Sequence, residues 1–208
     1  KQRRNTRMVS YRAVGDRCAV HFPSINLPIS QNKALEMLAQ RGFERLTVDI
    51  IALGRKLIGN SVYKRGARMY EAPDTLDCSS LTKWLYAQQG IWIPRRSIQQ
   101  REHGVRVSPE EVMRGDLLFT SGHIDYYLTN SQDGVGHVGI VTGEGTVIHA
   151  ANKMEGIIET QIEKFINNSP RGATRVIPVG YEVVTLKTPQ NREIEISEDI
   201  RWILLQNL

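Results

Sequence analysis

A predicted β-hairpin constrains the fold of this 208-residue chain more than any other feature. Two segments rich in β-branched residues, His137–Thr142 and Thr146–Ala151, are separated by the turn Gly143-Glu144-Gly145. Glycine in the last position of a three-residue loop is typical of the common hairpin turn of that length. Since the turn sets the pairing of the two strands, we expect Val141 to lie opposite Val147.

This register brings two histidines onto one face of the hairpin. His149 falls opposite Gly139, and His137 lies two residues further along on the same face. Diagonal neighbours of this kind are about 7–8 Å apart at the backbone, a distance that two imidazole rings can span. A two-residue loop would shift the pairing by one and place the histidines on opposite faces. The alternative to a functional pair is one surface histidine and one hydrogen-bonded core histidine.

Helical patterns precede the strands along the chain. Apolar residues recur at helical spacing in three segments that end at or near a glycine: Asn32–Arg41, Thr47–Leu57 and Asp77–Gly90. Four further strands are predicted beside the hairpin: Leu117–Thr120, Glu155–Glu159, Arg175–Val179 and Glu182–Lys187. Helices followed by strands are typical of an α+β domain in which helices pack on a central antiparallel β-sheet.

Cys78 is the first candidate for chemistry. It lies one residue inside the predicted N-terminus of a helix, where Asp77 is a favourable N-cap. Unpaired backbone N–H groups and the helix dipole favour negative charge there, so the nucleophilic thiolate forms more easily. Leu81 and Leu85 share this helix face, and their packing would hold the sulfur against the sheet. The alternative is a small buried hydrophobic residue.

The candidate cysteine and the histidine pair together suggest nucleophilic catalysis by a thiol. A cysteine nucleophile needs a base within hydrogen-bonding reach, and that base needs a partner that orients its ring. His137 would accept the thiol proton of Cys78, and His149 would fix the ring and the tautomer of His137. The three side chains would then form a Cys-His-His triad.

Five motifs resemble those of the NlpC family of cell-wall cysteine peptidases. They are DCSSL at 77–81, IPRRSIQQ at 93–100, RGDLLF at 114–119, GHVGIVTGEGTVIHA at 136–150 and ATRVIPV at 173–179. Their order, spacing and residue types match the family over more than half of the chain. The resemblance implies a papain-like fold and hydrolysis of amide bonds in peptidoglycan stem peptides, often between D-glutamate and a diamino acid. It implies no cofactor and no metal.

The resemblance also implies roles for particular residues. Cys78 would be the nucleophile, His137 the base and His149 the third polar member. The family carries a tyrosine near the oxyanion site; Tyr63 fits that position best, and Tyr70, nearer to Cys78 in sequence, is the competing candidate. The tyrosine hydroxyl and the Cys78 backbone N–H would donate to the tetrahedral oxyanion. The alternative for Tyr63 is a packed aromatic side chain.

Five further residues are expected to bind substrate: Asp77, Ser79, Ser97, Gly136 and Tyr126. Tyr126 belongs to the segment Ser121–Val135, which is long for a connection between two strands and contains several aromatic residues. We expect this loop to form a wall of the cleft that selects substrate. Ser80 and Ala67 stand where the family usually has glycine. The Ser80 side chain is expected either to narrow the cleft or to have no effect.

Composition indicates a globular protein. Hydrophobic residues make up 40% of the chain, charged residues 24%, and the net charge is +5. The apolar runs are far shorter than the ~20 residues that a membrane helix needs, so no membrane span is expected. A basic surface favours polyanionic surroundings such as bacterial wall polymer, or simply keeps the protein dispersed. No signal peptide is visible; a secreted or cell-envelope location and peptidoglycan peptides, rather than nucleic acid, as partners are expected from the resemblance.

One catalytic domain with an extension at each end is expected. Residues 1–45 are predicted as an N-terminal arm with a short helix, 46–180 as the NlpC-like peptidase domain and 181–208 as a C-terminal extension. Within the arm, residues 1–31 show no clear period. The apolar stretch Ile200–Leu205 is expected to be either a docked terminal helix or an oligomer contact.

Two alternative functions remain open. A papain-like amidase or acyltransferase acting on another acyl substrate would keep the triad, because fold and triad do not fix the acyl donor. A non-catalytic wall-binding module would keep the cleft without turnover. The presence of Cys78, His137 and His149 argues against that module, because a binding protein has no need of all three.

Overall fold

The structure, a computed structural model, describes residues 9–167, 169–206 and 208. Its contacts divide the chain into two compact units that interleave along the sequence. The unit called here the terminal unit comprises residues 1–48, 87–92 and 179–208, and the central unit comprises residues 49–86 and 93–178. Residues 1–8 of the predicted arm lie outside the described residues, and the domain boundaries at 45 and 180 stay predictions.

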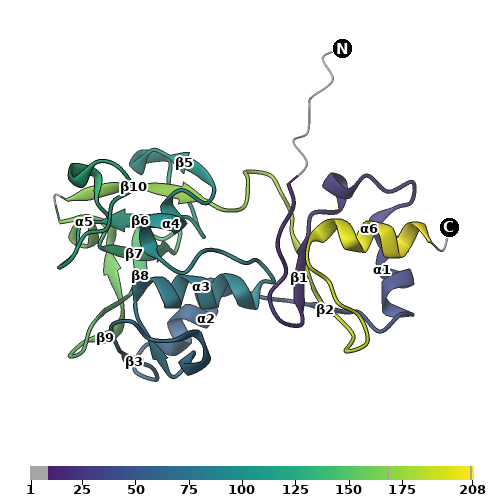
Figure 1. Ribbon diagram of the computed structural model, residues 1–208, viewed down its shortest axis with the longest axis horizontal. Helices are drawn as coiled ribbons and strands as arrows, with labels where there is room; N and C mark the ends of the chain where they lie inside the picture. Colours follow the sequence, from purple (N-terminus) through teal and green to yellow (C-terminus); the bar gives the residue numbers. More distant parts are fainter. Residues whose placement is uncertain (1–8, 168, 207) are drawn as a thin grey trace, which may run out of the picture. The chain divides into compact units, whose positions relative to one another are not determined.

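A six-stranded antiparallel sheet forms the centre of the central unit (Figure 1). Its strand order is β5-β10-β6-β7-β8-β9. The strands are β5 (Val105–Val107), β6 (Leu117–Thr120), β7 (His137–Val141), β8 (Thr146–Asn152), β9 (Gly156–Gln161) and β10 (Pro170–Arg175). Together with the helices that cover it, this sheet confirms the predicted α+β class.

Helices cover both faces of this sheet. They are α2 (Ile50–Leu57), α3 (Cys78–Gln88), α4 (Ser97–Arg101) and α5 (Ile162–Ile166). A Cβ on Gly54 of α2 would lie 3.2 Å from the Ile148 side chain and 3.5 Å from Leu85 of α3, so these two helices meet on one face. On the opposite face, Phe165 of α5 packs in a cluster with Val147 of β8.

Strands β7 and β8 form the hairpin in the predicted register. Val141 pairs with Val147, and Gly145 has a φ of +78°, which glycine adopts without the steric cost that other residues meet. His137 and His149 therefore lie on one face, as the loop length predicts. The prediction holds because a three-residue loop leaves one pairing that keeps the apolar residues of both strands buried.

Helix α3 begins at Cys78 and is capped by Asp77, as predicted. Asp77 Oδ1 accepts a hydrogen bond from the Ser80 N–H at 2.8 Å, and the Asp77 N–H donates to Ser80 Oγ at 2.8 Å. This reciprocal pair satisfies backbone donors at the start of the helix. Ser80 is fully buried and bonded back to Asp77, so it stabilises the helix start, a role that neither expectation for this residue included.

The predicted strand Arg175–Val179 is displaced in the structure. Strand β10 ends at Arg175, and Ala173 pairs with Leu118 of β6. Arg175 forms a buried ion pair with Asp116 at 2.6 Å, which fixes the end of the strand. The predicted strand begins too late because the β-branched residues after Arg175 favour a strand there. The ion pair that ends the strand joins residues far apart in sequence, so the local pattern does not show it.

The remaining elements of the central unit are short. Strands β3 (Val62–Tyr63) and β4 (Thr75–Leu76) pair in parallel. The 3₁₀ helices are η2 (Met69–Glu71), η3 (Pro109–Glu111) and η4 (Ser131–Asp133). Across the part of the chain that the structure describes, none of the helices has both the length and the hydropathy for a membrane crossing.

The terminal unit is built on a three-stranded antiparallel sheet in the order β1-β11-β2. Its elements are β1 (Arg17–Val20), η1 (Phe22–Ile25), α1 (Gln31–Ala39), β2 (Glu44–Leu46), β11 (Val184–Lys187) and α6 (Ser197–Leu205). The structure thus has a strand within residues 1–31, where the sequence predicts an extended arm. Cys18 of β1 is fully buried and unpaired in this core, opposite Leu186.

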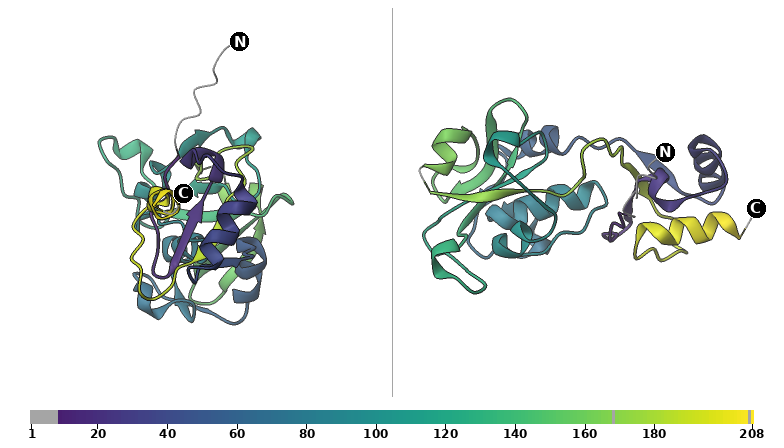
Figure 2. Two further views of the ribbon diagram at one scale, coloured as in Figure 1. Left: turned by 90° about the vertical axis from the view of Figure 1, so that its right-hand side faces the viewer. Right: turned by 90° about the horizontal axis from the view of Figure 1, so that it is seen from above.

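Helix α6 packs on β1 and α1 (Figure 2). Ile200, Ile203 and Leu204 are buried in the core of the terminal unit, whereas Trp202 on the other side of the helix is 56% exposed. The apolar stretch Ile200–Leu205 is therefore a docked terminal helix, the first of its two predicted alternatives.

Candidate active site

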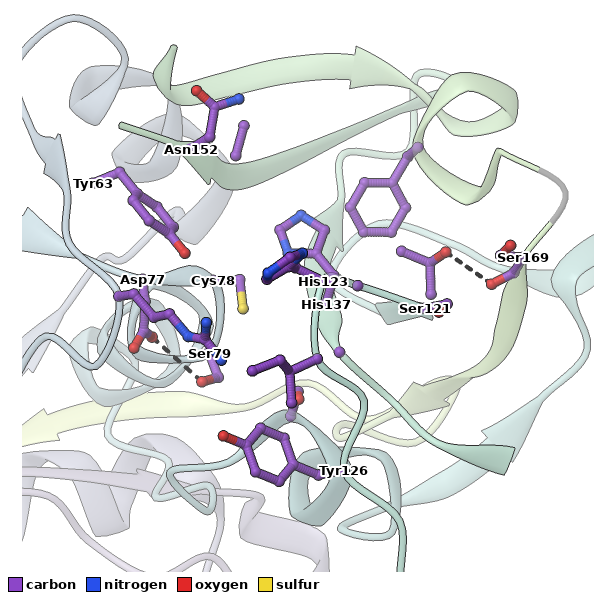
Figure 3. Close-up of a pocket in the computed structure, with 18 of the residues that line it drawn as sticks. Tyr63, Asp77, Cys78, Ser79, Ser121, His123, Tyr126, His137, Asn152 and Ser169 are labelled. Atoms are coloured by element: carbon purple, nitrogen blue, oxygen red, sulfur yellow. Dashed lines mark hydrogen bonds between the residues drawn. The ribbon is translucent and has the colours of Figure 1, made fainter. Parts of the chain in front are cut away.

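A cleft of about 1310 Å³ opens on the central unit (Figure 3). Eight of the nine predicted site residues line it: Tyr63, Asp77, Cys78, Ser79, Ser97, Tyr126, Gly136 and His137. The ninth, His149, is buried behind His137. Tyr70, the competitor of Tyr63, is 80% exposed and lies outside this cleft. The structure thus brings together residues that are up to 74 positions apart in sequence.

The two histidines form a hydrogen-bonded pair. His137 Nε2 lies 2.8 Å from His149 Nδ1, and the rings meet edge to face at 81°. On its far side, His149 Nε2 lies 3.1 Å from Thr160 Oγ1. Phe165 packs against both rings, with centroids 5.3 Å from His137 and 4.9 Å from His149. The His137–His149 hydrogen bond and the contact of His149 with Thr160 therefore fix both rings, and the Phe165 ring covers them.

Burial changes the acidity of both histidines. Loss of hydration lowers the pKa of His137 to about 4 and the pKa of His149 to about 3. The neighbouring His137 and the Lys164 ammonium group lower the pKa of His149 further, because each opposes a second positive charge. Both rings are consequently neutral near pH 7.

Cys78 is half-buried at the N-terminus of α3. Burial raises the pKa of its thiol to about 11, and the Asp77 carboxylate adds to this rise. The backbone N–H groups of Val138 and Ser79 point at the sulfur and oppose the rise, as does Arg95. Of these two groups only the Ser79 N–H belongs to the start of α3, whereas Val138 is on β7. The expected effect of the helix terminus is therefore present at Ser79, but burial outweighs it, and the net shift of the Cys78 pKa is opposite to the expected one. The resting cleft therefore contains a neutral thiol beside a neutral imidazole.

Tyr63 reaches the cleft from β3. Figure 3 shows its hydroxyl directed toward the side of the cleft where Cys78 lies, and His137 lines the same cleft. Burial and the nearby Cys78 and Asp77 raise the pKa of Tyr63, so its phenol stays protonated. A protonated phenol at this position is a hydrogen-bond donor available to a bound substrate.

Arg95 joins the two chain segments that lie on either side of Cys78 through hydrogen bonds. Its guanidinium donates to Asp77 Oδ2 at 2.6 Å, to Ser79 Oγ at 2.7 Å and to the carbonyl oxygen of Ala67 at 2.5 Å. Asp77 Oδ2 also accepts from the Gly66 N–H at 3.0 Å. Arg95 thus ties the start of α3 to the chain that follows Tyr63. It was not among the predicted site residues, although it lies in the IPRRSIQQ motif that indicated the family.

The segment 121–135 forms one wall of the cleft; hydrogen bonds within it close its first turn, and an ion pair fixes its far end to Arg101. Asp125 accepts from the Gly122 N–H at 2.8 Å and from Ser121 Oγ at 2.6 Å. At the other end, the buried Arg101 forms a two-pronged ion pair with Asp133, at 2.9 and 2.8 Å. These contacts and an isolated antiparallel β-bridge between Tyr126 and Val135 give the segment a defined shape, and it is called the braced wall below.

Tyr126 presents its ring to the cleft on this wall. The Arg96 guanidinium lies 5.5 Å from the ring centroid, a cation–π geometry that holds the ring in place. Arg96 is also one of the basic residues that line the cleft, which are Arg65, Arg95, Arg96, Lys153 and Lys164. Among the described lining residues Asp77 is the acidic one, and it is paired with Arg95. The cleft is therefore positively charged.

Within residues 9–167, 169–206 and 208, no three His, Cys, Asp or Glu side chains gather as a group that could hold a metal ion. His137 and His149 are instead satisfied by each other and by Thr160.

A cysteine at a helix N-terminus, in one cleft with a histidine that is bonded to a second polar side chain, defines the papain-like class of thiol-dependent enzymes. A sequence model of the NlpC/P60 family matches residues 60–174, which is more than half of the chain. The chain therefore belongs to the NlpC/P60 family. The fold agrees: a solved NlpC/P60 family protein from Bacillus cereus is similar with a TM-score of 0.53 at 27% identity, covering 62% of this chain and 40% of that one.

Curated relatives have peptidase names. A probable endopeptidase of Corynebacterium glutamicum is 37% identical over 114 residues, which cover 55% of this chain and 47% of the relative. A gamma-D-glutamyl-L-lysine dipeptidyl-peptidase of Bacillus cereus is 30% identical over 132 residues, covering 62% and 36%. The peptidoglycan DL-endopeptidase CwlO of Bacillus licheniformis is 36% identical over 104 residues, covering 48% and 21%. The chain spans less than half the length of these relatives.

Proposed function

We propose that this chain is a cysteine peptidase that hydrolyses the amide bond between D-glutamate and a diamino acid in peptidoglycan stem peptides. The observation that carries the proposal is the environment of His137. Its Nε2 atom is 2.8 Å from His149 Nδ1, and its ring lines the same cleft as Cys78. Nucleophile, base and orienting partner are then available within one small region, as acyl transfer by a thiol requires.

The first step is attack of the Cys78 sulfur on the substrate's carbonyl carbon. Since burial keeps both the thiol and the imidazole neutral beforehand, the proton passes to Nδ1 of His137 as the carbon–sulfur bond forms. The hydrogen bond to His149 Nδ1 stabilises the imidazolium that results. A neutral imidazole does so less than a carboxylate would, but it still fixes the ring and its tautomer.

The negative charge that develops on the carbonyl oxygen needs donors. The backbone N–H of Cys78 and the Tyr63 hydroxyl are proposed to supply them, which is supported by the protonated phenol at the cleft surface. Donors that are already held in place cost no reorganisation during the reaction. Tyr70, which is 80% exposed outside the cleft, has no role in this proposal.

Collapse of the tetrahedral intermediate breaks the carbon–nitrogen bond. His137 gives its proton to the leaving amine, and Cys78 keeps the acyl group as a thioester. A water molecule then attacks the thioester, and its proton passes to His137. The carbon–sulfur bond breaks, the free carboxylic acid leaves, and the thiol takes up its proton again.

The charge of the cleft supports an acidic peptide as substrate. A γ-linked D-glutamate keeps its α-carboxylate free, so the stem peptide brings negative charge close to the scissile bond. The basic lining residues, among them Arg65 and Lys153, complement that charge. The names of two relatives, a gamma-D-glutamyl-L-lysine dipeptidyl-peptidase and a peptidoglycan DL-endopeptidase, favour the same class of bond.

Substrate contacts are proposed for residues that line the cleft on both sides of Cys78: Ser79, Ser97, Tyr126 and Gly136. Asp77 is also part of the lining, but its carboxylate is engaged by Arg95, the Gly66 N–H and the Ser80 N–H. Its contribution to binding is therefore to hold the wall in shape. The braced wall is proposed to select among peptides through Tyr126.

A location at the bacterial cell envelope, by secretion or wall association, completes the proposal. Its support is the family and the polymeric substrate that the names of relatives give. The net charge of +5 suits an anionic wall polymer.

The test is mass spectrometry of purified muropeptides after incubation with the wild type, Cys78→Ala and Cys18→Ala. Cys18 is the matched control, because it is the other cysteine and is buried in the terminal unit. We expect wild type and Cys18→Ala to release fragments whose masses correspond to cleavage after D-glutamate, and Cys78→Ala to release none. No cleavage by the wild type would refute the substrate class, and cleavage by Cys78→Ala would refute the nucleophile.

A further inference from the structure

We propose that Thr160 is a positioning residue that sets the tautomers of both histidines. The catalytic triad is thereby extended to a row of four side chains, Cys78, His137, His149 and Thr160. This inference rests on the proposed function. Its observation is a contact outside the triad, the 3.1 Å approach of Thr160 Oγ1 to His149 Nε2.

The sheet register explains why Thr160 lies at this position. Thr160 of β9 pairs with Val147 of β8, and Ile158 pairs with His149. Side chains alternate between faces along a strand, so Thr160 is the diagonal neighbour of His149 on the same face of the sheet. Strand pairing, rather than a flexible loop, thus holds the hydroxyl beside the ring.

The direction of each hydrogen bond follows from the chemistry of the first step. His137 accepts the thiol proton at Nδ1 only if its own proton is on Nε2. That Nε2–H then donates to His149 Nδ1, which must be bare. His149 consequently carries its proton on Nε2, and this N–H donates to Thr160 Oγ1. The Thr160 hydroxyl is therefore the acceptor that completes the productive arrangement.

The surroundings make this acceptor important. His149 is buried, Phe165 covers both rings, and the ammonium group of Lys164 lies near enough to act on His149. A buried N–H that loses its acceptor is costly. Without the hydroxyl, His149 would favour the tautomer with its proton on Nδ1. That tautomer donates toward His137 and leaves His137 with a proton on the nitrogen that must accept from Cys78.

The kinetic test compares Thr160→Val, which keeps the shape, with Thr160→Ser, which keeps the hydroxyl. Thr146→Val is the matched control, because Thr146 is on the adjoining strand and its hydroxyl bonds to Thr142 and Glu159. With muropeptide substrate we expect kcat of Thr160→Val to fall about tenfold, which corresponds to the loss of one buried hydrogen bond, while KM changes less than twofold. Thr160→Ser and Thr146→Val are expected to keep at least half of the wild-type kcat.

A spectroscopic measurement reads the tautomers directly and needs no substrate. Ring ¹⁵N NMR at pH 8, with His149 assigned by comparison with His149→Asn, is expected to show the Nε2–H tautomer for both histidines of the wild type. In Thr160→Val, the His149 signal is expected to shift toward the Nδ1–H tautomer. A wild-type His149 protonated on Nδ1, or a Thr160→Val protein with wild-type tautomers and kcat, would overturn the inference. If the wild type cleaves no muropeptide, the proposed function fails, and the ring tautomers still decide the role of Thr160.

Discussion

The Nε2 atom of His137 lies 2.8 Å from the Nδ1 atom of His149, at the floor of the cleft that Cys78 lines. The contact joins two neighbouring strands on the same face of the sheet, so the backbone fixes its geometry. Because both rings are buried, the pair stays neutral near pH 7. These two properties, the fixed geometry of the hydrogen bond and the neutral charge of both rings, determine how the site is expected to respond to mutation and to pH.

Replacement of His149 tests the orienting role. We expect His149→Ala to lower kcat by about 10- to 100-fold with little change in KM, because the His137 ring loses the partner that fixes its tautomer. His149→Asn is expected to recover part of that loss, since an amide oxygen can accept from His137 Nε2–H. Steady-state kinetics on a defined stem peptide measure both variants. Equal activity of wild type and His149→Ala would contradict the role.

The pH dependence of kcat/KM tests the neutral resting pair. His137 must be unprotonated to accept the thiol proton, and its pKa is lowered to about 4. Activity is therefore expected to fall as the pH drops through about 4, well below the model-compound pKa of ~6.5. The alkaline side is expected to stay flat to about pH 11, where the thiol ionises. An acid limb centred near 6.5 would contradict the effect of burial.

The free energy of unfolding is expected to depend on pH through the protonation of His137 and His149. The unfolded chain binds a proton on each histidine below pH 6.5, whereas the folded protein resists protonation until about pH 4 at His137 and about pH 3 at His149. Their contribution to the free energy of unfolding is therefore present above pH 6.5 and lost as the pH falls from 6.5 toward 3. For His137 alone it is on the order of 3 kcal/mol.

Thermal unfolding from pH 7 to pH 4 measures this contribution. The wild type is expected to lose more stability over that range than the double variant His137→Asn/His149→Asn, which has lost both titrating rings. The double variant also controls for the carboxylates, which titrate in both proteins. Parallel pH profiles of the two proteins would show that the histidines do not contribute.

Tyr63 is expected to act through its hydroxyl alone. Tyr63→Phe keeps the ring but removes the donor, and loss of one oxyanion donor lowers kcat by about 10²-fold. Tyr70→Phe is the matched control, because Tyr70 is 80% exposed and lies outside the cleft. Kinetics of the two variants separate a donor from a packed aromatic residue. A Tyr63→Phe protein with wild-type kcat would support the packed aromatic.

The braced wall, segment 121–135, is expected to affect selection more than chemistry. Tyr126→Ala removes the ring held by Arg96, so kcat/KM should change unequally for peptides that differ next to the scissile bond. Tyr127→Ala is a suitable control, because Tyr127 is 54% exposed and is not part of the cleft lining. Competition between two muropeptides in one reaction gives the ratio directly. The same preference in Tyr126→Ala and wild type would count against a selecting wall.

Local sequence rules predicted the parts of the central unit that depend on neighbouring residues. The length of the Gly143–Gly145 loop was enough to fix the hairpin register, and Asp77 was enough to indicate the start of α3. The motifs around Cys78 and His137 indicated residues that the structure places in the lining of one cleft, while the roles of these residues stay predictions. Such features depend on turn geometry, capping and spacing, which are visible in short stretches of sequence.

Features that depend on distant partners could not be predicted in this way. Strand β1 was missed because its partner β11 is at the other end of the chain. Local sequence patterns do not indicate a pairing over that distance. Thr160 and Phe165 reach the histidines only through sheet register and helix packing. Arg95 lies in a recognised motif, yet its link between Asp77 and Ala67 requires the folded chain. Long-range contacts of this kind carry no period in the sequence.

The measurement that tests the central claim most directly is capture of the acyl-enzyme. Wild type, Cys18→Ala and Cys78→Ala are mixed with a defined stem peptide, quenched in acid within the first turnover and examined by intact mass and peptide mapping. Acid protonates His137 and stops release of the thioester. We predict an added mass equal to the acyl half of the peptide, on Cys78, in wild type and Cys18→Ala only. Cleavage without an adduct on Cys78, or an adduct that persists in Cys78→Ala, would contradict the account.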